Sequence, residues 1–131
     1  MIDHVGLSVA SLDAATAFYA AAFGFESEFR FELPGAVRGL MLLHPSGARL
    51  ELFEHPSSAA GLQGTVPLEA LATRGYGHFA WATADIGAAF ERALLAGATP
   101  IAKPGQSPEP GVLFAFLADP EGNLVELLQR P

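Results

Sequence analysis

The sequence contains no cysteine, so it forms no disulfides and offers no thiolate as a nucleophile or metal ligand. This absence is compatible with a reducing compartment, and we expect a cytoplasmic protein. Basic residues are also scarce, since 7 Lys and Arg stand against 14 Asp and Glu for a net charge of −7. Such a chain has no basic surface to neutralise phosphates, so no nucleic-acid partner is expected.

Long apolar runs are absent as well. No run approaches the roughly 20 residues that a membrane-spanning helix needs. The N-terminus shows neither the basic stretch nor the small-residue cleavage site of a signal peptide. We therefore expect no membrane partner. Half of the residues are nevertheless apolar, and 131 residues are enough to bury a core, so residues 1–131 are predicted to form a single domain.

The sequence repeats itself. His4 aligns with His78 at an offset of 74, and Glu51 aligns with Glu126 at an offset of 75. The segment HPSGARLEL (44–52) matches DPEGNLVEL (119–127) in its Pro, its Gly, its Glu and its last Leu. A duplicated unit is therefore expected, and each copy carries one His/Glu pair.

The first copy predicts the element order β-α-β-β-β. In residues 2–9 apolar residues alternate with small or polar ones, which is typical of a strand with one apolar face. Ser11 precedes an apolar stripe of helical spacing that ends at Gly24, so a capped helix is expected. Three strands are then predicted, over 26–33, 37–43 and 48–54.

The second copy predicts the same order. A strand is expected over 76–83 and a helix over 86–96, capped by Asp85 and ended by Gly97. The three remaining strands are predicted near 99–102, 112–118 and 123–129.

These elements divide the domain into three parts, which are a first module (1–54), a connecting loop (55–75) and a second module (76–131). The connecting loop is rich in Ser, Gly and Pro, with one helical turn predicted over 67–73. A second irregular stretch, residues 103–111, holds three prolines and predicts an exposed loop.

The two His/Glu pairs favour a metal site. Strand alternation places His4 opposite the apolar face of its strand, and it places Glu51 between two leucines that point the other way. Burying such a carboxylate costs free energy unless it has a partner. Taken singly, each of these residues is more often an ordinary solvated side chain. Together, two imidazoles and two carboxylates at matched positions suit one divalent Ni, Co, Zn, Mn or Fe ion with open positions for a ligand.

Four segments resemble the vicinal oxygen chelate superfamily, which includes glyoxalase I, extradiol dioxygenases and bleomycin-binding proteins. They are DHVGLSVASLDAATAFYAAAFGF, GARLELFE, YGHFAWATADI and FLADPEGNLVELLQ. The resemblance implies an α+β fold in which two βαβββ modules form a cupped mixed sheet around a central metal site, with the helices on the outer face. It also implies a homodimer, and it implies that the metal ligands are His4, Glu51, His78 and Glu126.

The same resemblance implies a metal-dependent lyase or isomerase of the glyoxalase type. Superfamily members with four protein ligands abstract a proton next to a metal-chelated carbonyl group, and a Glu at position 51 favours this class. Glu126 or Glu51 would act as general base and then as general acid. The partner would be a small-molecule substrate.

Glutathione specificity fits this sequence less well. In bacterial glyoxalase I a basic residue, an Asn and a Lys hold the glutathione. At the matching places this sequence has Ser8, His55 and approximately Pro108, which removes the charge-assisted contacts. We therefore expect a substrate other than a glutathione adduct.

Two other functions stay open. An Fe(II) or Mn(II) extradiol-type dioxygenase would use two His and one Glu and leave Glu51 off the metal. A metal-free small-molecule (drug) binding and resistance protein would perform no chemistry, and such superfamily members often lack the ligands that this sequence has.

Overall fold

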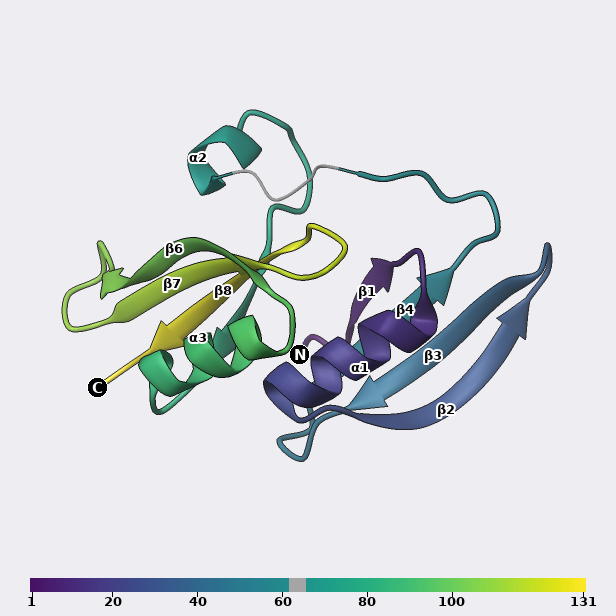
Figure 1. Ribbon diagram of the computed structural model, residues 1–131, viewed down its shortest axis with the longest axis horizontal. Helices are drawn as coiled ribbons and strands as arrows, with labels where there is room; N and C mark the ends of the chain where they lie inside the picture. Colours follow the sequence, from purple (N-terminus) through teal and green to yellow (C-terminus); the bar gives the residue numbers. More distant parts are fainter. Residues whose placement is uncertain (62–65) are drawn as a thin grey trace. The chain divides into compact units, whose positions relative to one another are not determined.

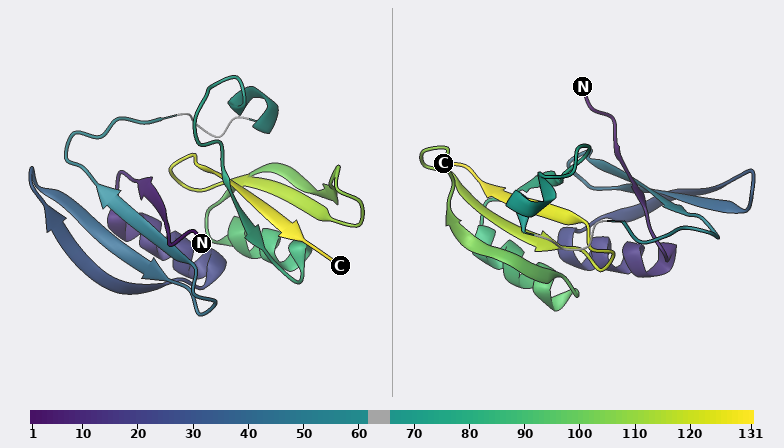
Figure 2. Two further views of the ribbon diagram at one scale, coloured as in Figure 1. Left: turned by 180° about the vertical axis from the view of Figure 1, so that it is seen from behind. Right: turned by 90° about the horizontal axis from the view of Figure 1, so that it is seen from above.

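The computed structural model describes residues 1–61 and 66–131. The chain divides into two compact units, Met1–Ala60 and Gly61–Pro131. Each unit contains a four-stranded mixed sheet with a long helix against one face (Figure 1). The two further views in Figure 2 show the same helix-on-sheet layering in each unit. The α+β class and the duplicated β-α-β-β-β order are thus confirmed.

The first unit is built on a sheet with the strand order β1-β4-β3-β2. β1 and β4 are parallel, whereas β4, β3 and β2 pair antiparallel. Its elements are β1 (Val5–Ser8), α1 (Leu12–Phe23), β2 (Glu26–Leu33), β3 (Val37–Leu43) and β4 (Arg49–Glu54).

The second unit repeats this topology with the order β5-β8-β7-β6, in which β5 and β8 are parallel. A short helix, α2 (Pro67–Ala70), lies before the repeated elements, inside the predicted turn of 67–73. The repeated elements are β5 (Phe79–Ala82), α3 (Ile86–Leu95), β6 (Thr99–Gln106), β7 (Leu113–Ala118) and β8 (Leu124–Gln129).

One prediction about the second unit is right only in part, since residues 107–111 form a loop as expected. Residues 103–106 belong to β6 rather than to the loop predicted over 103–111. β6 is an edge strand, and its pairing with β7 shifts between Pro100 and Ala102 and again between Ala102 and Gly105. Such a strand accommodates proline because it needs ladder hydrogen bonds on one side only. Pro100 and Pro104 therefore lie within the strand instead of ending it.

Both long helices begin at the predicted caps. The Ser11 side chain accepts a hydrogen bond from the N–H of Ala14, and the Asp85 side chain accepts one from Ala88. Gly24 ends α1 in the left-handed conformation, with φ of 79°. None of the described helices has the length and apolar character that crossing a membrane requires.

The last strand of each sheet supplies a second acceptor to the helix start. Glu54 Oε2 accepts the N–H of Leu12 at 2.8 Å, and Gln129 Oε1 accepts the N–H of Ile86 at 2.8 Å. Glu54 also pairs with Arg38. The hydrogen bond from Leu12, helped by Arg38, lowers the pKa of the Glu54 carboxyl group. The side chain that accepts this hydrogen bond between sheet and helix is therefore a carboxylate in the first unit and a neutral amide in the second.

The helix-facing sides of the sheets form the core. Together with the facing sides of the helices they bury apolar residues almost completely, among them Leu12, Tyr19, Leu40, Leu42 and Leu52 in the first unit and Ala93, Leu117, Val125 and Leu127 in the second. The polar residues of the strands are left on the opposite, helix-free faces.

Replacing Glu54 with Gln should reduce the acid sensitivity of the fold. The amide keeps an acceptor for Leu12, as Gln129 does for Ile86, but it does not ionise. Because folding lowers the Glu54 pKa, its ionised form contributes stability above the ordinary Glu pKa of about 4.3, and this contribution is lost as pH falls through the lowered value. Urea unfolding should show wild type losing more stability than E54Q between neutral and acidic pH. Parallel pH profiles would contradict the role of this carboxylate.

Candidate metal site

The central strand β4 separates the core from the candidate site. Leu50 and Leu52 are 3% and 0% exposed on the helix side. Glu51 lies between them and therefore faces the helix-free side, where 21% of its side chain is exposed. The alternation predicted for this strand is confirmed by its burial pattern.

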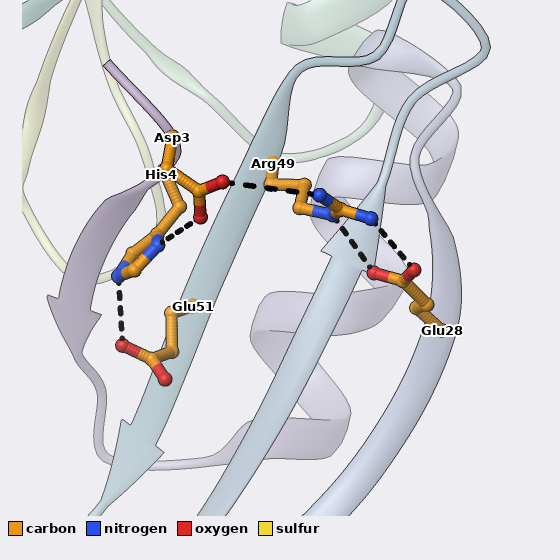
Figure 3. Close-up of polar contacts among 5 residues, drawn as sticks. All are labelled: Asp3, His4, Glu28, Arg49 and Glu51. Carbon is orange, nitrogen blue, oxygen red and sulfur yellow. Dashed lines mark hydrogen bonds and ion pairs between the residues drawn. The ribbon is translucent and has the colours of Figure 1, made fainter. Parts of the chain in front are cut away.

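The first unit brings His4 and Glu51 together. His4 directly precedes β1, which begins three residues later than the predicted range 2–9. β1 pairs in parallel with β4, and this pairing places Gly6 beside Glu51. The two side chains approach with 3.2 Å between His4 Nε2 and Glu51 Oε2 (Figure 3). Both remain accessible, with 37% of the imidazole and 21% of the carboxylate side chain exposed.

The second unit brings His78 and Glu126 together in the same way. His78 precedes β5, whose parallel pairing with β8 places Ala80 beside Glu126. His78 Nε2 lies 3.1 Å from Glu126 Oε2, and the side chains are 34% and 19% exposed. The sequence repeat thus corresponds to a repeat of the same two atoms at nearly the same separation.

The two pairs lie in different units, and their convergence on one ion stays a prediction. Within residues 1–61 and 66–131, no group of three or more His, Cys, Asp and Glu side chains is gathered closely enough to hold a metal ion. Each described unit supplies a pair of donors, so a four-ligand site needs both pairs.

The geometry of each pair fits a shared divalent ion. Nitrogen and oxygen ligands bind such ions at about 2.0–2.2 Å, so two neighbouring ligands of one ion lie about 3 Å apart. The separations of 3.2 and 3.1 Å match this spacing. The donor set, neutral imidazole and carboxylate, also suits Ni, Co, Zn, Mn or Fe(II).

A third residue, which the sequence analysis missed, holds the far side of the His4 ring. Asp3 Oδ1 lies 2.8 Å from His4 Nδ1. This hydrogen bond raises the pKa of His4, and it lowers the pKa of Asp3. The signal for it in the sequence was an acidic residue directly before the candidate ligand.

An aromatic patch, defined as Phe29, Phe31 and Phe53, lies on the same helix-free face as Glu51. The register places Phe31, Gly39 and Phe53 side by side on β2, β3 and β4. Phe31 covers Gly39, where an added Cβ would overlap the ring. Its ring centroid lies 5.8 Å from that of Phe53 and 5.8 Å from that of Phe29. Phe29 is 52% exposed, so the patch presents an apolar surface beside the first pair.

The second unit has its own aromatic contact at the pair. Phe116 is the register partner of Glu126, and its ring meets the His78 ring edge-on at 5.0 Å. Phe114 lies two positions along the same strand, 6.0 Å from Phe116. Phe116 is 6% exposed, and the register places both rings on the helix-free face with Glu126.

The family is shown by comparison with known proteins. Residues 1–127 match the family model described as the Glyoxalase/Bleomycin resistance protein/Dioxygenase superfamily. The chain belongs to this superfamily. No curated protein sequence matches it.

Solved structures agree with this assignment. Glyoxalase I from Zea mays is 25% identical, with a TM-score of 0.79, over 98% of this chain and 44% of the maize chain. A glyoxalase family protein from Bacillus cereus is 24% identical, with a TM-score of 0.80, over 98% of this chain and 92% of that chain. A domain of the same superfamily from Frankia sp. is 18% identical, with a TM-score of 0.80, over 100% of this chain and 98% of that chain. The chain thus spans less than half of the maize protein, and the two less similar structures show the fold alone.

Proposed function

We propose that the protein is a metal-dependent lyase or isomerase of the glyoxalase type. In this proposal one divalent ion is held by His4, Glu51, His78 and Glu126. The observation that carries it is the duplicated pair, in which a His Nε2 faces a Glu Oε2 at 3.2 Å in one unit and 3.1 Å in the other. Superfamily membership supports it, because many of the superfamily's reactions start from a chelated pair of substrate oxygens.

The proposed reaction moves a proton between neighbouring carbon atoms. A bound divalent ion would supply Lewis acidity and a template for the substrate's carbonyl and hydroxyl oxygens. Glu126 or Glu51 would take the proton from the carbon next to the carbonyl group and return it to the adjacent carbon. Both carboxylates are partly exposed, at 19% and 21%, so substrate can reach them.

The proposed substrate is small and partly apolar. The aromatic patch offers an apolar surface next to Glu51. The positions expected to hold glutathione do not supply its charged contacts, since Ser8 is neutral and His55 Nδ1 already accepts the N–H of Ser57. We further propose that the protein is a homodimer, on the basis of the family resemblance. The proposed location is the cytoplasm, on the basis of the lack of cysteine.

Metal content tests the four-ligand site. Protein purified without a tag should carry about one Ni, Co, Zn, Mn or Fe ion per chain by mass spectrometry. His4→Ala and His78→Ala should each lose most of it, because each removes one donor from the same ion. His44→Asn is a matched control, since His44 is a turn residue bonded to Ser46. If wild type binds none of these ions, even after incubation with each of them, the proposed metal site would be wrong. That result would favour the metal-free binding protein.

Glu51→Ala separates the proposed function from an extradiol-type dioxygenase. If Glu51 is a ligand, the variant should bind metal about 10- to 100-fold more weakly, a loss typical of a disrupted metal site. Glu91→Ala, which removes an exposed carboxylate from α3, should bind as wild type does. If Glu51→Ala keeps its metal affinity and only Glu126→Ala loses it, the ligands would be two His and one Glu. That result would favour the dioxygenase.

Hydroxamates test the apolar part of the proposed substrate, because they chelate metal through two neighbouring oxygens. Benzohydroxamate should bind the cobalt-loaded protein about tenfold more tightly than acetohydroxamate, read from the cobalt absorption spectrum. Phe31→Ala should remove most of this preference. Leu95→Ala, which alters a 90% exposed leucine on α3, should not. An equal preference in wild type and Phe31→Ala would show that the patch does not contact the ligand.

A further inference from the structure

We propose that Asp3 is a positioning residue, which holds the His4 imidazole in the tautomer that leaves Nε2 free to bind metal. This inference rests on the proposed function in so far as His4 is a ligand. It goes further by assigning a role to a residue that no ligand pattern includes. It also implies that the two histidines differ, because within the described residues only His4 of the two has a carboxylate at its Nδ1.

The hydrogen bond at Nδ1 carries the inference. Asp3 Oδ1 lies 2.8 Å from His4 Nδ1, and an ionised carboxylate only accepts hydrogen bonds. Both ring nitrogens face a carboxylate, but the 2.8 Å contact at Nδ1 is shorter than the 3.2 Å contact between Nε2 and Glu51 Oε2, so the neutral His4 ring carries its proton mainly on Nδ1. Its lone pair is then on Nε2, the atom 3.2 Å from Glu51 Oε2. A ligating histidine whose second nitrogen donates to a carboxylate has a defined tautomer and ring orientation.

Two further charged residues hold the Asp3 carboxylate in turn (Figure 3). Arg49 Nη1 lies 4.0 Å from Asp3 Oδ2. The Arg49 guanidinium is itself fixed by Glu28 through two hydrogen bonds, of 3.0 Å from Nε and 2.9 Å from Nη2. Arg49 is on β4 and Glu28 is on β2, so the sheet anchors the chain of contacts that ends at His4. The 4.0 Å contact is longer than a hydrogen bond and partly exposed, so it contributes little to stability.

The second unit lacks the equivalent carboxylate. At the offset of 74 that aligns His4 with His78, Asp3 aligns with Gly77, which has no side chain. The His78 ring instead meets the edge of Phe116 at 5.0 Å. Loss of Asp3 should therefore alter His4 and leave His78 unchanged, which gives an internal control within one protein.

Nitrogen-15 NMR of the metal-free protein tests the tautomer directly. The spectra are recorded at about pH 9, well above the ordinary His pKa of about 6.5. In wild type His4 should show a protonated Nδ1 and an unprotonated Nε2. Asp3→Ala should shift the His4 signals toward the Nε2–H tautomer, whereas the His78 signals should stay in place. Asp3→Asn should keep much of the wild-type pattern, because its amide oxygen still accepts from Nδ1.

Zinc titration then tests the consequence for metal binding. Asp3→Ala should weaken zinc binding about 10- to 100-fold, with partial rescue by Asp3→Asn. Asp13→Ala is the charge-matched control, since it removes an exposed carboxylate of the same unit and should bind zinc as wild type does.

The outcomes separate this inference from the proposed function. Unchanged His4 signals in Asp3→Ala would overturn the positioning role, and so would a normal zinc affinity in that variant. If wild type itself binds no zinc or other divalent ion, the proposed function fails, whereas the tautomer spectra still decide whether Asp3 orients the His4 ring.

Discussion

The parallel pairing of the first and last strand of each module is the constraint on which the rest of this structure depends. It places Gly6 beside Glu51 and Ala80 beside Glu126, and so brings a histidine that precedes one strand to a glutamate in the middle of another. A shift of one residue would turn Glu51 toward α1 and expose the leucines beside it. Burial of those leucines therefore holds the candidate ligands in place.

Each sheet carries its buried core and its candidate ligands on opposite faces. The helix side holds fully buried side chains such as Leu52 and Leu127, whereas the helix-free side holds the partly exposed His/Glu pairs. Around the pairs the two modules have diverged. In the first module Asp3 contacts the histidine and the ionised Glu54 accepts a hydrogen bond from the start of α1. The second module has Gly77 and the neutral Gln129 at the matching positions. Duplication thus preserved the pairs while the residues that support them changed.

Much of the fold could be predicted because its signals are local. Ser11, Asp85 and Gly24 mark helix ends through backbone hydrogen bonds and a left-handed φ that depend on near neighbours. Prediction failed at β6, where prolines suggested a loop, because an edge strand tolerates them through a partner that is distant in sequence. Asp3 was missed for a related reason, since its importance depends on where the His4 ring points.

The sequence by itself determined the duplicated βαβββ order and the His/Glu pairs, because strand and helix periodicities are properties of consecutive residues. It also determined which face of β4 carries Glu51, through the leucines on either side. Only the tertiary structure decided that each His Nε2 lies about 3 Å from its Glu and that Asp3 and Arg49 stand behind His4. The His/Glu pairs and the Asp3–Arg49 contact join residues 46 or more positions apart and depend on strand register, whereas the contact between the neighbours Asp3 and His4 depends on side-chain direction. Sequence patterns specify neither.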